Sequence, residues 1–178
     1  YYLNNVIKFI DFIDVCLKVK IKNFVFSSTC AVYDDSFRKV DEKTPLKPKN
    51  IYGKTKLFCE QLLKNFSKDY KFNYSILRYF NVIGADSKCR VGQLNDSGHL
   101  FMNLSNSIVK KKYIANIYGT NYKTRDGSAV RDFIDVEDLS NIHLAILEKM
   151  KKNNKSYEIN CGTGKGFSVL EILSNFEN

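Results

Sequence analysis

The sequence contains few of the residues that build metal sites or disulfide frameworks. It has two histidines and five cysteines, and no two cysteines stand at the short spacing typical of a zinc ligand pair. We therefore expect no metal, and an odd set of unpaired cysteines is typical of a reducing compartment. We expect no signal peptide, and no apolar run in the sequence approaches the roughly 20 residues that a membrane span requires. We expect a cytoplasmic protein without a membrane partner.

Arginine is scarce, although the chain is basic. The net charge is +9, yet most of the 28 basic residues are lysines, scattered along the chain, with Lys110-Lys111-Lys112 as the longest cluster. Nucleic-acid-binding proteins usually rely on arginine forks within a recognisable module, and neither occurs here. Solvated lysine-rich surfaces explain the charge better, so we expect no nucleic-acid partner. An anionic small ligand would also suit a basic protein.

Apolar periodicity predicts strands that alternate with helices. A mostly buried helix with one polar stripe is expected first, and a helix capped by Ser168 with Glu171 three residues later is expected last. Strands are predicted at 24–26, 74–80, 114–118, 133–134 and 157–160, and helices at 5–19, 52–68, 100–111, 136–149 and from 168 onward. Alternation without hairpin signals favours an α/β fold with a doubly wound parallel sheet.

Two polar clusters stand where a parallel sheet would bring them together. Ser27-Ser28-Thr29 ends the first strand, and Tyr52-Gly53-Lys54-Thr55-Lys56 opens the following helix. Tyr52 and Lys56 are four residues apart and therefore neighbours on the helix surface, where a phenol beside an ammonium suits proton transfer. Sites of α/β proteins lie at the carboxyl edge of the sheet, so we predict an active site there. Strand-end caps and a solvated lysine are the alternative interpretation.

The Tyr52 helix is predicted to be amphipathic. We expect its apolar face to consist of Thr55, Phe58, Cys59, Leu62, Leu63 and Phe66, and its polar face of Lys54, Glu60, Lys64 and Asn65. Cys59 is thereby interpreted as a small core residue rather than a reactive thiol.

Four stretches in order resemble one family along essentially the whole chain. They are the Ser28-Thr29 strand end together with the Tyr52-to-Lys56 helix start, the run 77–85, the run 124–136 and the run 160–171. Together they resemble extended short-chain dehydrogenases, and within them the UDP-glucose 4-epimerase family. The chain departs from the family pattern at Asp34, Ile51, Val82, Phe101-Met102 and Asp135, none of which removes a catalytic group.

The resemblance implies a fold and its division. It implies an incomplete Rossmann-like, NAD-binding sheet with part of a smaller C-terminal substrate domain. Residues 1–83 would be the second half of the NAD-binding domain, and 84–178 would be substrate-domain segments interleaved with returning strands. The family's Gly-x-x-Gly-x-x-Gly turn for the cofactor pyrophosphate does not occur. Because this turn is missing, we interpret the chain as an inactive fragment. The run Gly162–Gly166 matches another family segment, so we expect no phosphate there.

The implied chemistry is an NAD-dependent isomerase reaction of galactose metabolism. A UDP-hexose, UDP-glucose or UDP-galactose, would be epimerised at C4 through a 4-keto intermediate, with Tyr52 as base. Lowering a tyrosine pKa from about 10 by ~3 units costs about 4 kcal/mol. One positive charge at ~5 Å contributes roughly 3 kcal/mol at an effective dielectric near 20. Lys56 and the oxidised nicotinamide are therefore expected to act together.

The resemblance also assigns roles by position. Catalysis would use Tyr52, Lys56 and Thr29. Cofactor contacts would come from these three with Asn4 and Phe80, and substrate contacts from Thr29, Tyr52, Asn81, His99, Leu100, Asn116, Tyr118 and Arg131. Alternatively, Arg131 would only pair with Asp132 or Asp135, and Tyr79, Phe80 and His143 would only pack. The family usually forms homodimers through the Tyr-Lys helix and the helix before it, so a homodimer is expected.

Other functions compete with this one. Nucleotide-sugar dehydratases of the superfamily carry an acidic pair after the Ser/Thr position, where this chain has Cys30 and Ala31. Epimerases acting on UDP-N-acetylhexosamines, UDP-pentoses or UDP-uronates remain open. A non-catalytic nucleotide-sugar-binding homologue would not need Thr29, Tyr52 and Lys56.

Overall fold

The chain divides into two compact units. The computed structural model describes residues 1–36, 39–93, 98–112 and 114–177. Unit 1 comprises Tyr1–Phe80 and Ser140–Cys161, and unit 2 comprises Asn81–Leu139 and Gly162–Asn178. The assignment of 1–83 and 84–178 to the domains of a larger enzyme stays a prediction.

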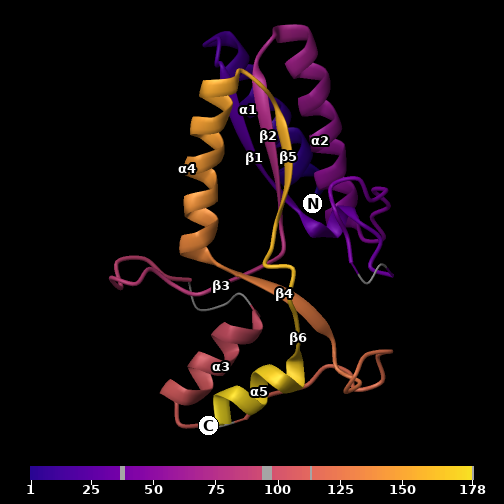
Figure 1. The fold of residues 1–178 in the computed structure, drawn as a ribbon, viewed down its shortest axis with the longest axis vertical. Coiled ribbons are helices and arrows are strands. Elements are labelled where there is room, and N and C mark those ends of the chain that lie inside the picture. Colours follow the sequence, from indigo (N-terminus) through magenta and orange to yellow (C-terminus); the bar gives the residue numbers. More distant parts are fainter. Residues whose placement is uncertain (37–38, 94–97, 113, 178) are drawn as a thin grey trace. The chain divides into compact units, whose positions relative to one another are not determined.

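Unit 1 is built on a parallel sheet, which confirms the predicted fold class. Its strands are β1 (Asn23–Thr29), β2 (Asn73–Tyr79) and β5 (Tyr157–Cys161), in the order β1-β2-β5 (Figure 1). The register aligns Phe26 with Ile76 and Thr29 with Tyr79. Because alternate residues of a strand face opposite sides, Phe26 and Ser28 share one face of the sheet, whereas Ser27 lies on the other.

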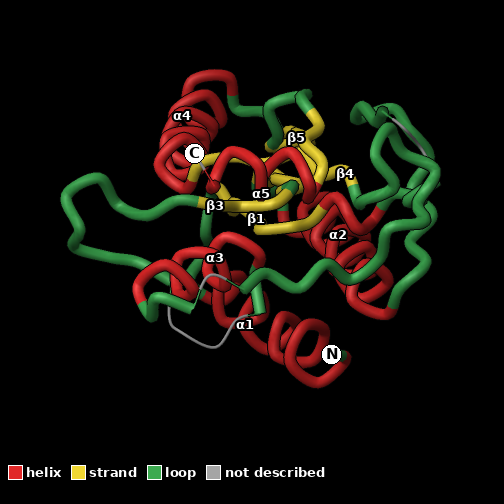
Figure 2. The backbone as a smooth tube through the Cα atoms, turned by 90° about the horizontal axis from the view of Figure 1, so that it is seen from below, coloured by secondary structure: helices red, strands yellow, loops and turns green. Residues whose placement is uncertain are grey.

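Helices cover both faces of this sheet (Figure 2). The first layer contains a π-helix, η1 (Tyr2–Ile7), and the helices α1 (Lys8–Lys18) and α2 (Ile51–Tyr70); the second contains α4 (Val136–Asn153). A short 3₁₀ turn, η2 (Cys30–Val32), follows β1. The first layer buries a core of Val6, Phe9, Ile13, Phe26, Cys59, Leu63, Phe72 and Ile76. Cys59 is fully buried, as predicted.

The prediction of a mostly buried first helix was wrong. Only Val6, Phe9 and Ile13 of η1 and α1 are buried, because a single face of the helix meets the sheet. Cys16 and Leu17 are partly buried against the core, whereas five further apolar side chains stay exposed, namely Leu3, Ile7, Ile10, Phe12 and Val15.

A buried ion pair ties α2 to the sheet. Glu60 and Arg78 are both 0% exposed, and the Arg78 Nε and Nη2 donate to the two Glu60 carboxylate oxygens at 3.1 and 2.8 Å. Arg78 also donates to Glu158 and Tyr33, and the Ser28 hydroxyl donates to Glu60. The predicted faces of α2 were therefore partly wrong: Glu60 is buried because Arg78 neutralises it, and Phe58 is exposed.

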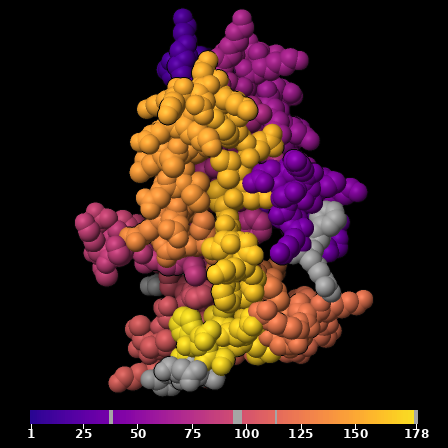
Figure 3. All heavy atoms as spheres, viewed as in Figure 1, coloured from indigo at the N-terminus to yellow at the C-terminus, as the bar shows by residue number. Residues whose placement is uncertain are grey.

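The segment between η2 and α2 lies against the end of β5. The Tyr33 phenol donates to Asn160 at 2.8 Å, and the Asn160 amide donates to Glu42 at 2.8 Å. In Figure 3, residues 39–50 form the violet surface beside β5. Apart from an isolated bridge between Tyr33 and Leu46, the described residues of this segment are irregular, and two of them are prolines.

Unit 2 is smaller and less regular. Its strands are β3 (Asn81–Ile83), β4 (Val130–Asp135) and β6 (Gly166–Ser168), and its helices are α3 (Leu100–Val109) and α5 (Val169–Glu177). β3 pairs with β4 in parallel, whereas β6 runs antiparallel to β4, a pairing that the alternation of elements did not predict.

The predicted strand at 114–118 is not formed. A strand requires a partner for its backbone hydrogen bonds, and no described strand pairs with this segment. Ile114 is 74% and Tyr118 is 85% exposed.

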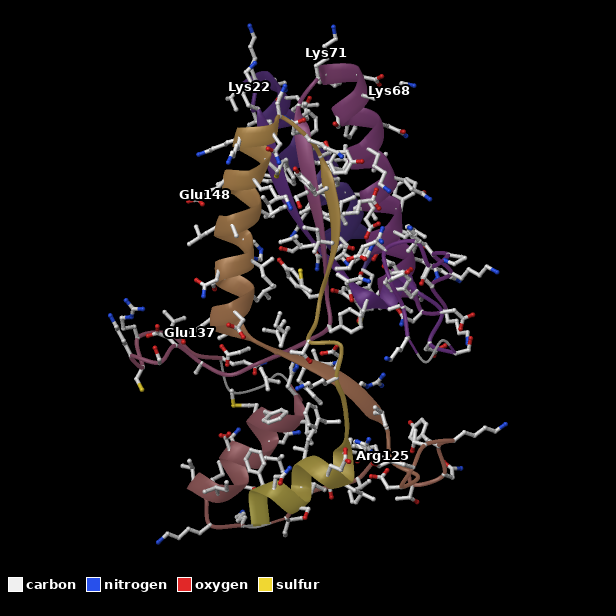
Figure 4. The ribbon with its side chains drawn as sticks, in the orientation of Figure 1. Lys22, Lys68, Lys71, Arg125, Glu137 and Glu148 are labelled. Atoms are coloured by element: carbon white, nitrogen blue, oxygen red, sulfur yellow. The ribbon has the colours of Figure 1, made fainter. Side chains whose placement is uncertain are left out.

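The predicted starts of the last two helices are confirmed. The Ser168 amide donates to Glu171 at 2.8 Å and the Glu171 amide donates to the Ser168 hydroxyl at 3.1 Å, which is a capping box at α5. Asp135 accepts from the Glu137 amide at 2.8 Å at the start of α4. Arg125, labelled in Figure 4, forms an ion pair with Glu171.

Candidate functional site

The start of α2 lies directly against the turn that follows β1. The Asn50 side chain caps the helix by accepting from the Gly53 amide at 2.7 Å. At Gly53 a Cβ atom would lie 2.1 Å from the Ala31 carbonyl oxygen, so only glycine permits this approach. The approach brings Tyr52, one residue before Gly53, to Thr29 at the end of β1.

Thr29 and Tyr52 meet through their hydroxyl groups. Their side chains share a hydrogen bond, and the Thr29 oxygen also accepts from the Ala31 amide at 3.2 Å. The Tyr1 ring packs against the Tyr52 ring with 5.8 Å between centroids. The structure thus brings two of the three predicted catalytic side chains into contact.

Lys56 lies on the same side of the sheet as Tyr52. Its Nζ is 6.0 Å from the centroid of the Tyr52 ring and 5.1 Å from that of Phe26. The Nζ donates to the Ser27 carbonyl oxygen at 3.0 Å. The ammonium is therefore anchored to the strand that ends in Thr29.

Burial dominates the electrostatics of this cluster. It raises the pKa of the Tyr52 phenol, an effect that the hydrogen bond from Thr29 partly offsets. Burial also lowers the pKa of Lys56. In the chain by itself the phenol is therefore held neutral, and an added positive charge is needed to make its phenolate accessible.

The remaining predicted cofactor residues, Asn4 and Phe80, also belong to unit 1. Phe80 follows β2, and its amide donates to the Cys161 carbonyl at 3.1 Å. Asn4 is exposed on η1. Its neighbour Asn5 fixes η1 to α2, since its amide group donates to Thr55 at 3.1 Å and its carbonyl accepts from the Cys59 thiol.

The predicted UDP-site residues gather in unit 2 around one cavity of about 810 Å³. They are Asn81, His99, Leu100, Asn116, Tyr118 and Arg131. The Asn81 side chain is fixed by donating to the Asp132 carbonyl at 3.0 Å. The structure also adds an aromatic pair that the sequence did not indicate, Phe101 and Phe133, whose ring centroids are 5.3 Å apart at the cavity wall.

The two carboxylates proposed as alternative partners of Arg131 are engaged elsewhere. Asp132 accepts from Thr163 and Gly164, and Asp135 accepts from the Glu137 amide. Of the ion pairs formed by the described residues, none includes Arg131. Arg131 is one of the residues that line the cavity.

The glycine-rich run from Gly162 to Gly166 already surrounds an anion. One Asp132 oxygen accepts from the Thr163 amide at 2.9 Å and from its hydroxyl at 2.8 Å, and the other accepts from the Gly164 amide at 2.8 Å. An internal carboxylate thus uses the amides that a phosphate would need.

The sequence did not predict the contacts of a second set of polar residues in unit 1. Glu60 stands four residues after Lys56, a spacing that places both on one row of the helix. Ser27, Tyr79 and His143 form a hydrogen-bonded chain described below.

Within the described parts of the chain, no helix is long and apolar enough to cross a membrane, and no three potential metal ligands cluster.

Comparison with known proteins matches this arrangement to one family. The model of the NAD dependent epimerase/dehydratase family matches residues 1–162. The UDP-glucose 4-epimerase of Lactobacillus helveticus is 39% identical over 177 residues, which cover 98% of this chain and 54% of that protein. The chain spans about half the length of the curated relatives it matches.

Solved structures give the same result. The chain superposes on UDP-glucose 4-epimerase from Stenotrophomonas maltophila, solved with NAD and formylated UDP-arabinopyranose, with a TM-score of 0.92 and 30% identity; the match covers 99% of this chain and 54% of that one. For the UDP-Glc/GlcNAc 4-epimerase of Campylobacter jejuni the TM-score is 0.76, the identity 39% and the coverage 98% and 54%. The chain belongs to the NAD dependent epimerase/dehydratase family.

Proposed function

We propose that the full-length protein is an NAD-dependent 4-epimerase that interconverts UDP-glucose and UDP-galactose. The observation that carries the proposal is the hydrogen bond between Thr29 and Tyr52 beside the Lys56 ammonium. A strand-end hydroxyl, a half-buried phenol and a lysine are the groups that the reaction requires. The relatives named above support the substrate class.

The residues of unit 1 fit the cofactor by the chemistry of their donors. An ammonium has three hydrogens, and one of those on Lys56 is directed at the Ser27 carbonyl, which leaves others for ribose hydroxyls. Asn4, Thr29, Tyr52, Lys56 and Phe80 would hold NAD. The chemistry that NAD supplies when bound is acceptance of the hydride from sugar C4 and its return to the opposite face.

The proton steps belong to the chain. The Tyr52 phenolate takes the proton of the sugar 4-hydroxyl while C4 is oxidised, and gives it back when C4 is reduced. Thr29 orients that hydroxyl. Burial raises the pKa of the Tyr52 phenol, so the charges of Lys56 and of the oxidised nicotinamide would have to act together to favour the phenolate.

The cavity of unit 2 would bind the UDP portion of the substrate. Arg131 would pair with the diphosphate, and Asn81, His99, Leu100, Asn116 and Tyr118 would contact the nucleotide. Other nucleotide sugars share this portion, so the cavity supports epimerases of UDP-N-acetylhexosamines, UDP-pentoses or UDP-uronates as the alternative. Comparative turnover of UDP-galactose and its N-acetylated analogue by the full-length protein separates these functions.

We further propose that the full-length protein is a homodimer and that residues 1–178 alone have no turnover. The exposed apolar side chains of η1, α1 and α2, including Ile7, Phe12 and Phe58, support an interface there. A monomeric mass in light scattering would contradict the dimer. A cytoplasmic location stays a prediction.

The proposed function is tested by Tyr52→Phe in the full-length protein. We expect turnover of UDP-galactose to fall by about 10³-fold or more, because the base is lost, while binding of the UDP-sugar changes little. Tyr70→Phe is the matched control, since Tyr70 is 60% exposed at the far end of the same helix. Unchanged turnover in Tyr52→Phe would contradict the mechanism, and a wild type that binds UDP-sugars without turning them over would indicate a non-catalytic homologue.

A further inference from the structure

Ser27 is contacted on both faces of the sheet in unit 1. From the α2 layer, Lys56 Nζ donates to its carbonyl oxygen at 3.0 Å. On the sheet face covered by α4, the Tyr79 phenol donates to its Oγ at 2.7 Å. One residue of β1 therefore joins the lysine of the candidate site to a side chain on the opposite face.

Tyr79 is held in turn by a residue of α4. The Tyr79 oxygen and His143 Nε2 are 2.6 Å apart, and the two ring centroids are 5.7 Å apart. A phenol has a single hydrogen; when it goes to Ser27, the tautomer of His143 with its hydrogen on Nε2 would donate to the Tyr79 oxygen. Burial raises the pKa of Tyr79, which keeps this hydrogen in place near neutral pH.

Lys56 needs such an anchor. A lysine side chain loses up to about 2 kcal/mol of conformational entropy when it is fixed, and burial works against its charged form. The Ser27 carbonyl is the hydrogen-bond acceptor that holds Nζ beside Tyr52. Any shift of Ser27 therefore moves the ammonium relative to the phenol.

We propose that Tyr79 and His143 are positioning residues for Lys56, because they hold Ser27 and with it the carbonyl that anchors the ammonium. This inference rests on the proposed function, in which Lys56 supplies the charge that favours the Tyr52 phenolate. It gives His143 and Tyr79 a role other than packing between α4 and the sheet.

The test compares single and double variants of the full-length protein. We expect Tyr79→Phe and His143→Leu each to lower kcat for UDP-galactose about tenfold with little change in KM, because they loosen a support rather than a substrate contact. The double variant should be no slower than either single one, since both break the same chain. His143→Gln should restore most of the rate, because its amide nitrogen can donate in place of Nε2. Tyr74→Phe, on the same strand, is the control.

A second readout does not depend on turnover. The acetylation rate of Lys56, measured by peptide mass spectrometry relative to the exposed Lys54 of the same helix, should rise in Tyr79→Phe and His143→Leu. Ser27→Ala removes only the hydroxyl that accepts from Tyr79 and should give the same rise, which keeps the test open if an aromatic variant fails to fold.

The outcomes separate the inference from the proposed function. If the wild type lacks epimerase activity, the proposed function fails, and the acetylation of Lys56 still decides whether Tyr79 and His143 anchor it. Unchanged Lys56 acetylation in all three variants would overturn the inference. So would losses of kcat that add up in the double variant or that His143→Gln does not recover.

Discussion

The two units differ in what their interiors are made of. Unit 1 contains the continuous core beneath its sheet and a buried ion pair between Glu60 and Arg78. Among the described residues of unit 2 the buried apolar side chains are Leu104, Ile134, Leu139 and Ile172, and the unit contains a cavity of about 810 Å³. The candidate proton-transfer groups thus stand on the densely packed unit, whereas the candidate nucleotide contacts stand on the more open one.

Their polar contacts differ in the same way. In unit 1, side chains bond to side chains across elements, as Ser28, Glu60 and Arg78 do. In unit 2, carboxylates organise loops by accepting backbone amides: Asp126 accepts from Ser128 at 2.9 Å, and Asp132 from Thr163 and Gly164. A reacting pair needs sub-ångström placement, which rigid elements provide, while a large ligand can be held by several loops.

The largest difference should follow from Arg78→Met in the full-length protein. It leaves Glu60 buried without its partner, and we expect unit 1 to lose about 3–5 kcal/mol of stability. Hydrogen exchange should show faster exchange in α2 and β2 and little change in α3. Arg90→Met is the control, because the Arg90 side chain is 68% exposed and solvent screens its pair with Asp86. An equal increase of hydrogen exchange in both units would contradict the expectation that Arg78 stabilises unit 1 and not unit 2.

A smaller difference should separate two buried leucines. Leu-to-Ala changes cost about 2–5 kcal/mol, with the larger losses where the surroundings cannot relax. Leu63 is fully buried in the core of unit 1, whereas Leu104 already lines the cavity of unit 2. We expect Leu63→Ala near the top of that range and Leu104→Ala near the bottom, measured as local stability by hydrogen exchange. The reverse order would show that the cavity wall is the more tightly packed of the two.

Ligand binding should give the smallest and most selective effect. UDP at a hundred times its Kd should stabilise unit 2 by about 2.7 kcal/mol, seen as slower amide exchange in α3 and around Arg131. Unit 1 should change little, because its proposed groups act on the sugar and the cofactor. Arg131→Met should abolish most of this protection, while Arg125→Met, outside the cavity lining, should keep it. Protection confined to unit 1 would refute the nucleotide assignment.

Local sequence patterns predicted the elements that carry their own signals. The sequence correctly predicted the helix with Tyr52 and Lys56 and the capping box of Ser168 and Glu171. It also predicted the strands β1, β2, β4 and β5. These elements are predictable because caps and periodicity act within a few residues. The burial of Glu60 was not predicted, since it depends on Arg78, which lies in another element. The three-residue strands β3 and β6 form only against β4, and 114–118 looks like a strand but pairs with none that is described.

The candidate site was predictable to a similar degree. The residues themselves came from motifs, but the direction of the Tyr52 pKa shift did not, because it depends on how much solvent the fold removes. Likewise, spacing could not relate His143 to Ser27, which lies more than a hundred residues earlier in the chain. Such contacts depend on the tertiary structure alone.

Because of Gly53, the start of α2 cannot accept a side chain at this position without moving away from Ala31. Where the helix passes the Ala31 carbonyl, there is room for a hydrogen atom and none for a methyl group. The approach of Tyr52 to Thr29 therefore depends on the hydrogen atom that Gly53 has in place of a side chain, and this atom takes no part in the proposed reaction. A mutagenesis study limited to polar residues would leave out Gly53, although the contact between Thr29 and Tyr52 depends on it.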